Sequence, residues 1–489
     1  MKQSLISELL LYKYRYLIGY GLLALCVSAL LLTDFSSVPA GVSNAEMRSV
    51  VASNAINILQ PQFSDMINAP YHLLQKASVS FLGLSNFSIR LPSLLLAIIT
   101  AITLTVTLNK WFRSNVAMIA SLIAITSVPF ITISRNGTAA ILYVLLVSFI
   151  LYSASMLLTK RSGTLFGWKL LIVLSCALLL YMPLGIYALL ALGVAAIFHP
   201  HIRHQLKKTK WYQYMIFAFL SALIVVPIAI SVIFDPLVIA TLLNGTAPVS
   251  QNILDGNHLA QLKLLATTLL SFGSPSIDGA ILPFVSLPFA LFVLIGLVKI
   301  IVDSHSARSY LIFVWLLSAL PLLYLNPNRF TLILIPSILL LAIGIDTFMR
   351  EWYKLFPRNP YARMAAFVPI TLIVLGFVTI APARYFYGYY YTDTTSTHQP
   401  ELQAIRDSIE PQLTTRLIVE QDSTEFYDIL RREYPLLTVA TSETTGEDRQ
   451  QRSIVLDRTD IQINKAPEKI LSSSNRDKPV LLRVYNNTR

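Results

Sequence analysis

Charged residues are scarce in this sequence. Only 13% of its 489 residues are Asp, Glu, Lys or Arg, whereas soluble proteins contain about 25%. Hydrophobic residues make up 55% of the chain, in uninterrupted blocks close to the roughly 20 residues that a membrane-crossing helix needs. This composition excludes a soluble globular protein and indicates a polytopic membrane protein.

Cysteine is nearly absent. Cys26 and Cys176 both lie inside apolar blocks, which excludes a disulfide framework and a zinc site with Cys/His spacing. A cleavable signal peptide is not evident either, because the first segment, MKQSLISELLLYKYRY, is charged and interrupted by polar residues. We interpret the apolar block that follows it as the first crossing and not as the apolar region of a signal.

The apolar blocks predict eleven crossings. They cover 17–34, 88–108, 115–133, 138–158, 168–182, 184–198, 212–234, 280–302, 309–325, 330–348 and 364–382. The loops on the side of the N-terminus contain 18 Lys and Arg residues, and the opposite loops contain six: Arg48, Lys76, Arg90, Arg135, Lys263 and Arg329. The positive-inside rule then predicts a cytoplasmic N-terminus and a C-terminal segment outside.

The net charge of +12 has the same origin. The excess of Lys and Arg lies between the apolar blocks of residues 1–383, so membrane topology accounts for it. We therefore predict no nucleic-acid partner, although such a charge on a soluble protein is typical of nucleic-acid binding.

Two segments of the first outside loop have apolar residues at helical spacing. They read AEMRSVVASNAINIL and APYHLLQKASVSFLGL. Both are too short to cross a membrane and too apolar to lie free in water, which favours helices in the membrane interface.

The composition changes after Arg384, where strand-like and helix-like segments alternate. We predict a transmembrane domain over 1–383 and an extracytoplasmic α/β domain over 384–489. The predicted fold class is an all-α polytopic membrane protein with about 11 transmembrane helices, interfacial helices in the first outside loop, and this small C-terminal α/β domain.

The acids of the transmembrane part gather on the outside. Asp34, Glu46 and Asp65 all fall in the first outside loop, where a carboxylate is placed to deprotonate an acceptor hydroxyl beside a membrane lipid. Glu46 is the candidate catalytic base, because it comes early in a predicted interfacial helix. Asp65 is a second catalytic candidate, and Asp34 and Asp65 are candidates to support the base or to bind a divalent cation. The alternative is that these are solvated loop acids.

Basic residues on the same side suit a phosphate. Arg135 ends one crossing and Arg329 begins another, and a guanidinium pairs with phosphate oxygens in a bidentate fork. The alternative is that both arginines are anchors at the membrane edge. His72 and His258 are also outside and are candidates to contact a ligand or a metal, whereas HPHIRH at 199–204 is interpreted as a cytoplasmic loop.

Five segments, taken in order, resemble the GT-C superfamily of membrane glycosyltransferases, on the branch of the protein O-mannosyltransferases and the aminoarabinose transferase of lipid A. They are PAGVSNAEM at 39–47, NAPYH at 68–72, FLGLSNFSIRLPSLL at 81–95, ISRNGTAA at 133–140 and NPNRFTLILIPSILLLAIGI from residue 326. The resemblance covers about residues 10–350.

Three positions depart from the family pattern. Ala45 stands where the family has its base, Asn68 stands in place of a His or Lys, and Ala140 stands where an acid is often found. The resemblance therefore implies that Glu46 has taken over as base, with Asp65 as a second candidate, or that activity is altered. Asn68 joins Asp34, His72 and His258 as a candidate supporting or metal-binding residue.

The resemblance implies a glycosyltransferase, of the hexosyl or pentosyl type, in the plasma membrane of a bacterium. It would move a sugar from a polyprenyl-phosphate donor to a lipid, glycan or protein acceptor on the extracytoplasmic face, with Arg135 and Arg329 toward the donor phosphate. Membrane lipids would be further partners. Two alternatives stay open. One is a non-catalytic glycolipid-binding relative, favoured by Ala45 and Ala140. The other is a secondary transporter, which is less favoured because no charged residue stands in the middle of a crossing, the two halves of the chain do not match, and the acids cluster at one surface.

Overall fold

The computed structural model describes most of the chain. The described residues are 15–56, 66–159, 165–245, 249–270, 276–277, 280–281, 287–303, 307–356, 361, 365, 367–391, 398–399, 401–441, 452–456, 459, 466–472 and 480–485. Asp65, one of the two catalytic candidates, lies outside them.

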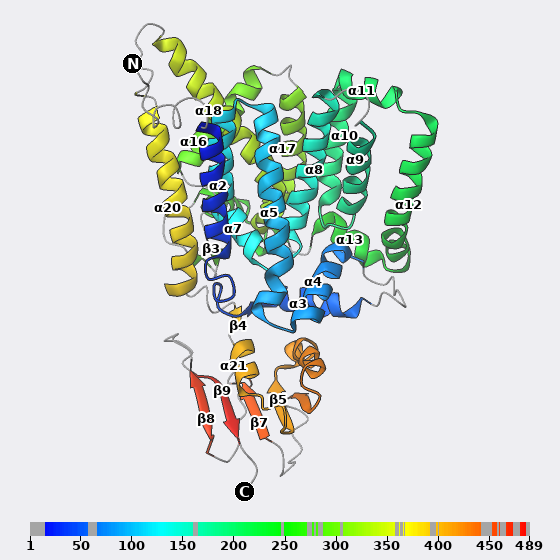
Figure 1. Ribbon diagram of the computed structural model, residues 1–489, viewed down its shortest axis with the longest axis vertical. Helices are drawn as coiled ribbons and strands as arrows, with labels where there is room; N and C mark the ends of the chain where they lie inside the picture. Colours follow the sequence, from blue (N-terminus) through cyan, green and yellow to red (C-terminus); the bar gives the residue numbers. More distant parts are fainter. Residues whose placement is uncertain are drawn as a thin grey trace, which may run out of the picture.

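A bundle of apolar helices forms the larger part of the molecule (Figure 1). Its helices are α2 (Arg15–Leu32), α5 (Asn86–Trp111), α6 (Ser114–Ile125), α7 (Val128–Arg135), α8 (Ala140–Thr159), α9 (Leu165–Leu179), α10 (Gly185–Phe198), α12 (Trp211–Phe234), α16 (Leu287–Val302), α17 (Ala307–Leu325), α18 (Thr331–Leu355) and α20 (Phe367–Tyr391). Each coincides with a predicted crossing, or with part of one.

Within the described residues, five helices are long and apolar enough to cross a membrane. The predicted crossing at 115–133 is instead a pair, α6 and α7, bent by 58°. Pro129 stands in the first turn of α7. Proline has no backbone N–H, so it cannot donate the hydrogen bond that would continue the α6 helix into α7. Counting this pair as one span gives up to six, and five further apolar helices are shorter. The number of crossings therefore stays a prediction.

The helices α5, α8 and α18 lie at the centre of the bundle and are buried over 67%, 78% and 78% of their most apolar windows, whereas α12 at its edge is only 17% buried. Close helix contacts rest on small residues, as is common where lipid gives no hydrophobic drive between helices. A Cβ on Gly344 of α18 would lie 1.9 Å from the carbonyl oxygen of Phe292 on α16, and one on Gly296 would lie 2.1 Å from that of Leu340.

Short helices cover both ends of the bundle. At the lower end in Figure 1, the two segments predicted to lie in the interface form α3 (Asn44–Ala55) and α4 (Ala69–Leu82). The opposite end carries α11 (Pro200–Lys207). The sequence pattern did not indicate α13 (Pro236–Asn244), α14 (Gln251–Leu254) and α15 (His258–Leu270), nor the 3₁₀ turn η3 (Pro327–Arg329) and the short strands β2 (Ser276–Ile277) and β3 (Ala280–Ile281).

The C-terminal part is a small α/β domain, as predicted. It comprises β4 (His398–Gln399), α21 (Glu401–Ser408), β5 (Thr415–Val419), η5 (Gln421–Ser423), α22 (Thr424–Asp428), η6 (Ile429–Arg432), β6 (Leu437–Thr441), β7 (Arg452–Leu456), β8 (Lys469–Ser472) and β9 (Val480–Tyr485). The sheet has the order β6-β5-β7-β9-β8. Its pairs β5–β6 and β5–β7 are parallel, and β7–β9 and β8–β9 are antiparallel. The boundary predicted at 383/384 falls inside α20, which continues to Tyr391.

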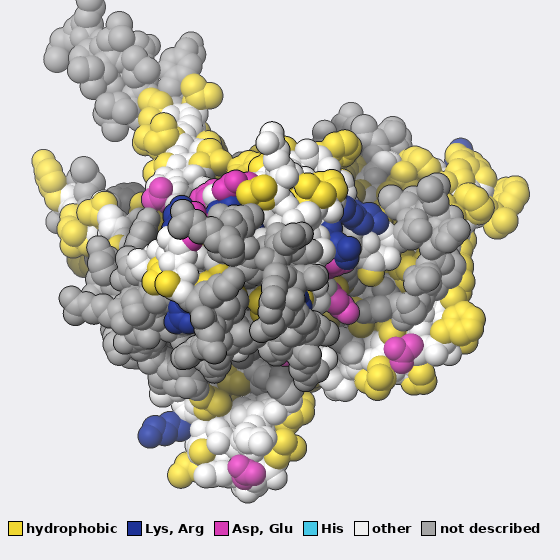
Figure 2. All heavy atoms as spheres, turned by 90° about the horizontal axis from the view of Figure 1, so that it is seen from below, with side chains coloured by type: hydrophobic (Ala, Val, Ile, Leu, Met, Phe, Trp, Pro, Cys, Tyr) yellow, Lys and Arg dark blue, Asp and Glu magenta, His cyan; other side chains and the backbone are white. Residues whose placement is uncertain are grey.

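This domain shares a hydrophobic core with the first outside loop. Loop residues Val42, Met47 and Val50 pack in one cluster with domain residues such as Leu402 and Leu430. The strand β1 (Val42–Ser43) also pairs antiparallel with β4. Viewed from the domain side, acidic and basic side chains lie on this face and hydrophobic side chains surround its margin (Figure 2). The loop and the domain are therefore packed as one unit below the helix bundle.

Candidate functional site

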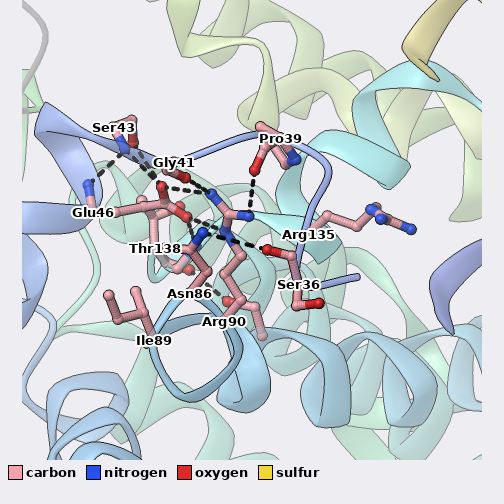
Figure 3. Close-up of polar contacts among 12 residues, drawn as sticks. Ser36, Pro39, Gly41, Ser43, Glu46, Asn86, Ile89, Arg90, Arg135 and Thr138 are labelled. Carbon is pink, nitrogen blue, oxygen red and sulfur yellow. Dashed lines mark hydrogen bonds and ion pairs between the residues drawn. The ribbon is translucent and has the colours of Figure 1, made fainter. Parts of the chain in front are cut away.

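The carboxylate of Glu46 forms a buried ion pair with Arg90. Ser43 caps α3, and Glu46 stands at the third helical position of the resulting capping box. Arg90 Nε donates to Glu46 Oε1 at 2.8 Å, and Arg90 Nη2 donates to Oε2 at 3.2 Å. Both side chains are 0% exposed. Arg90 comes from the first turns of α5, so this pair ties the first outside loop to the second predicted crossing (Figure 3).

Further donors complete the surroundings of the Glu46 carboxylate. The backbone N–H of Gly137 donates to Oε1 at 2.8 Å, and that of Ser43 donates to Oε2 at 2.8 Å. Arg90 meanwhile donates from Nη1 to the carbonyl oxygen of Pro39 at 2.8 Å and from Nη2 to that of Gly41. Such a carboxylate is held as an anion and has no exposed oxygen with which to meet an acceptor hydroxyl. In this conformation, its contacts are those of a residue that positions the loop.

Arg135 holds the turn that follows α2. The guanidinium is 0% exposed and donates to four carbonyl oxygens: those of Leu30 at 2.9 Å, Leu31 at 3.3 Å, Asp34 at 2.8 Å and Val38 at 3.0 Å. The last carbonyls of a helix lack partners within the helix, and a cation at that end also suits the helix dipole. Arg135 thus satisfies the end of α2.

Three aromatic rings enclose the same guanidinium. Arg135 Cζ lies 5.8 Å from the ring centre of Phe35, 5.8 Å from that of Tyr385 and 5.1 Å from that of Phe386. Tyr385 and Phe386 belong to α20, so this helix packs on the first outside loop through the Arg135 guanidinium. The contacts of Arg135 in this structure are to protein groups, and a donor phosphate would have to approach from outside this enclosure.

Asp34 occupies the turn that Arg135 holds. Its φ angle of 47° is unusual for a residue other than glycine, and the residue is exposed. Ala45, which stands at the family's base position in the resemblance, is exposed as well, one residue before the buried Glu46. Of the first-loop acids that the structure describes, Asp34 is the one at the surface.

Asn68 and His72 belong to the start of α4. Asn68 has a φ angle of 57°, and its backbone N–H donates to the carbonyl oxygen of Tyr181 at 2.9 Å. His72 is 8% exposed, and burial lowers the pKa of its imidazole to about 4. His72 is therefore a neutral side chain at pH 7.

Arg329 and His258 belong to a second cluster, formed by α15, the end of α17 and η3. His258 Nδ1 lies 2.9 Å from the hydroxyl oxygen of Tyr324, and the two rings are stacked with centroids 6.5 Å apart. Arg329 is 4% exposed. Burial lowers the pKa of its guanidinium. This cluster combines a buried cation with an exposed imidazole.

The candidate metal ligands do not come together in the part of the chain that the structure covers. Within it, no group of three or more His, Cys, Asp and Glu residues is placed to hold a metal ion. Asp34 and His72 belong to different elements of the first outside loop, and His258 belongs to the second cluster. The donor set therefore gives no fit for a divalent cation among the described residues.

Sequence reasoning missed Arg90 and Gly137. Arg90 stands in FLGLSNFSIRLPSLL, one of the five segments that carry the resemblance. Its place in that segment was the one indication in the sequence that Arg90 belongs to the site. Gly137 follows the Ser-Arg segment, and a Cβ there would lie 2.9 Å from the carbonyl oxygen of Ile89. Only glycine lets this backbone approach α5 closely enough to reach Glu46.

Comparisons with known proteins give the same fold. Residues 70–230 match the family described as dolichyl-phosphate-mannose-protein mannosyltransferase, and no curated protein sequence matches the chain. The crystal structure of ArnT from Cupriavidus metallidurans bound to undecaprenyl phosphate is 11% identical, with a TM-score of 0.52 over 96% of this chain and 97% of that one. The Archaeoglobus fulgidus oligosaccharyltransferase tethered with an acceptor peptide is 11% identical, with a TM-score of 0.53 over 89% of this chain and 65% of that one. The chain therefore has the fold of the GT-C membrane glycosyltransferases, with a relationship to the mannosyltransferase family over residues 70–230 and a likeness to ArnT along nearly its whole length.

Proposed function

We propose that this protein is an integral membrane glycosyltransferase that moves a sugar from a polyprenyl-phosphate donor to an acceptor hydroxyl. The observation that carries the proposal is the GT-C fold along 96% of the chain, shared with a structure that holds undecaprenyl phosphate. The match of residues 70–230 to a family named for a lipid-phosphate-linked sugar supports the same donor class. The acceptor would be a lipid, a glycan or a protein.

The reaction would take place at the end of the bundle formed by the first outside loop and the C-terminal domain. The acceptor oxygen attacks the anomeric carbon of the sugar, the bond to the lipid phosphate breaks, and a carboxylate takes the acceptor proton. The cytoplasmic N-terminus, the extracytoplasmic C-terminal domain and the bacterial plasma membrane belong to this proposal.

Glu46 remains a candidate base in this proposal, but it can act only if its carboxylate first leaves its present partners. Deprotonating an acceptor would require the carboxylate to leave Arg90 and two backbone N–H groups. Asp65 is the alternative base that the sequence indicates, and Asp34, which is exposed beside the Arg135 turn, is a candidate to support the base. We propose that Glu46 positions the loop in the resting protein.

A non-catalytic glycolipid-binding protein is the second candidate. Two observations favour it: Ala45 presents a methyl group where the family resemblance places the base, and the neighbouring acid is buried in an ion pair. Such a protein would bind the lipid-linked sugar without breaking its bond to phosphate.

Purified full-length protein incubated with a panel of polyprenyl-phosphate sugars and with acceptor lipids and peptides separates the two candidates. Release of polyprenyl phosphate with a matching glycosylated acceptor supports the transferase. Saturable binding of the same donors without release supports the binding protein. If none of the donors binds or reacts, both candidates are wrong.

Arg329 and Arg135 are expected to differ in this assay. Arg329→Gln should raise the KM for the donor by roughly tenfold to over a hundredfold if its guanidinium contacts the phosphate, because a charge-assisted hydrogen bond contributes about 1.5–3 kcal/mol. Arg135→Gln should lower the melting temperature, because four carbonyl oxygens lose their donor. Arg48→Gln, at an exposed position of α3, is the control. An unchanged KM in Arg329→Gln would leave Arg329 as a membrane-edge anchor.

A further inference from the structure

A cavity lies at the end of the helix bundle opposite the C-terminal domain, away from the candidate functional site. Its volume is about 770 Å³, within the roughly 300–1,000 Å³ typical of ligand pockets. The walls come from α5, α8, α9, α10, α12 and α17. Each contributes residues from the half that lies at the upper end in Figure 1.

Apolar side chains form most of this cavity. Ile150, Leu151, Ile172, Leu189 and Leu192 are among its lining residues. The outer wall is α12, the helix that is only 17% buried in the bundle. Because α12 is at the margin of the bundle, the cavity lies close to the surrounding lipid.

Basic residues accompany this apolar space, and none of its described lining residues is acidic. Lys110 of α5, Lys169 of α9 and Arg308 of α17 all line it. The hydroxyl groups of Ser155, Thr209 and Ser221 also belong to the lining. An apolar space with cations and hydroxyls in its lining matches the chemistry of a lipid with an anionic headgroup.

Lys169 is a cation of this lining that does not extend into water. A lysine near the end of a membrane helix usually extends its ammonium group to the solvent. Lys169 is instead 8% exposed, and its Nζ donates to Thr209 Oγ1 at 2.7 Å, across the cavity wall from α9 to the segment before α12.

We propose that this cavity binds an anionic phospholipid from the leaflet at the basic end of the bundle. One acyl chain lies among the leucine and isoleucine side chains, and the phosphate lies near Lys110, Lys169 and Arg308. The three hydroxyls face the glycerol and ester oxygens. This site is separate from the proposed transfer reaction and does not depend on it.

Lipid titration followed by native mass spectrometry of the purified full-length protein tests the proposal. The probes are palmitoyl-oleoyl phosphatidylglycerol and phosphatidylcholine, which differ in headgroup charge and not in acyl chains. We expect a Kd at least about tenfold lower for phosphatidylglycerol, because basic residues near a membrane surface each favour anionic lipid by about that order. Equal affinities for the two lipids would overturn the proposal.

Two matched pairs of variants locate the bound lipid. Gly193 lines the cavity, and a Cβ there meets nothing within 4 Å; Gly193→Trp should fill the space and abolish tight binding of phosphatidylglycerol. Gly167 is equally open and is not among the lining residues, so Gly167→Trp should bind as the wild type does. Binding that survives Gly193→Trp would place the lipid elsewhere.

The second pair tests the charge. Joint replacement of Lys110, Lys169 and Arg308 by Gln should remove the preference for phosphatidylglycerol, whereas replacement of Lys299, Arg350 and Lys354, at the same end but outside this cavity, should preserve it. If the triple variant fails to fold, Lys169→Gln alone is the test, and it should reduce the preference for phosphatidylglycerol. Undecaprenyl phosphate forms a third arm: if it binds here more tightly than phosphatidylglycerol and is lost in Gly193→Trp, the phospholipid assignment is wrong.

Discussion

Glu46 and Arg90 form an ion pair from which water is excluded. Removing two charges from water costs several kcal/mol per ion, so such a pair contributes little net stability, whereas removal of one partner typically costs about 3–5 kcal/mol because the other charge is left buried. The backbone donors at Ser43 and Gly137 add to the stabilisation of the carboxylate. The pair therefore fixes where the first outside loop meets α5.

Glu46→Gln should lower both the melting temperature and the turnover of the protein. The paired variant Glu46→Gln/Arg90→Gln removes the buried charge altogether and should recover much of the lost stability. If Glu46 positions the loop, turnover should recover with stability. If Glu46 is the base, turnover should stay reduced by about 10²–10⁴-fold in a well-folded double variant. Melting curves and donor turnover, measured on the same preparations, distinguish these outcomes.

His72 gives a pH dependence of stability. Its pKa is about 4 in the folded protein, against 6.5 for an ordinary imidazole, so the unfolded chain takes up the proton first as the pH falls. Stability should therefore decrease between about pH 6.5 and pH 4, by up to about 1.4 kcal/mol per pH unit. His72→Gln should flatten this part of the pH profile of the melting temperature, and His258→Gln, at an exposed position, is the matched control. An identical profile in His72→Gln would contradict the assignment.

The sequence was sufficient to find Glu46 but not its partner. The acid was singled out by its type and by its place after the first crossing, and both are local properties. Arg90 is 44 residues away, and in the sequence it was simply one of six basic residues on the outside. The burial of Glu46 and its pairing with Arg90 depend on how α3, α5 and the segment at Gly137 pack together. A local sequence pattern does not contain this information.

At the scale of elements, the helices of the bundle followed the apolar blocks closely. A helix that crosses a bilayer needs a long run of apolar residues, and its backbone groups must form their hydrogen bonds within the helix because the bilayer core holds no water. The bend between α6 and α7 was not predicted, since both halves are apolar. Helices α13 to α15 were also missed. They have 9, 4 and 13 residues, which is too short for a crossing, and tertiary contacts such as the hydrogen bond from Gln261 Nε2 to the carbonyl oxygen of Tyr324 hold them in place.

Gly137 tests the contact between two such elements. In Gly137→Ala, the new Cβ would lie 2.6 Å from Ile89 Cγ2 and 2.9 Å from the Ile89 carbonyl oxygen, so α5 or the loop must move. We expect a loss of about 1–3 kcal/mol of stability, read as a lower melting temperature. Gly167→Ala, where a Cβ meets nothing within 4 Å, should be neutral or slightly stabilising, because alanine is favoured in helices. Equal melting temperatures in the two variants would show that α5 adapts without cost.

At the scale of the whole molecule, described segments that the topology assigns to opposite sides lie at opposite ends of the bundle. The basic segment α11 lies at one end of the bundle, and α3, α4 and the C-terminal domain lie at the other (Figure 1). Which end faces the cytoplasm rests on the split of 18 to six basic residues.

Site-directed labelling decides the orientation. In a variant without Cys26 and Cys176, a cysteine substituted for the exposed Gln412 should react with an impermeant reagent on intact cells. A cysteine substituted for the exposed Arg203 in α11 should react only after the membrane is permeabilised. The reverse pattern would invert the topology.

The core shared by the first outside loop and the C-terminal domain has a consequence for how the protein folds during its synthesis. The ribosome makes Val42, Met47 and Val50 several hundred residues before the domain residues that cover them, such as Leu430 and Val484. Until those domain residues have been made, the apolar side chains of the loop stay uncovered at the membrane surface. A stop codon before the C-terminal domain would therefore expose the loop as well as remove the domain, and we expect the truncated chain to be degraded.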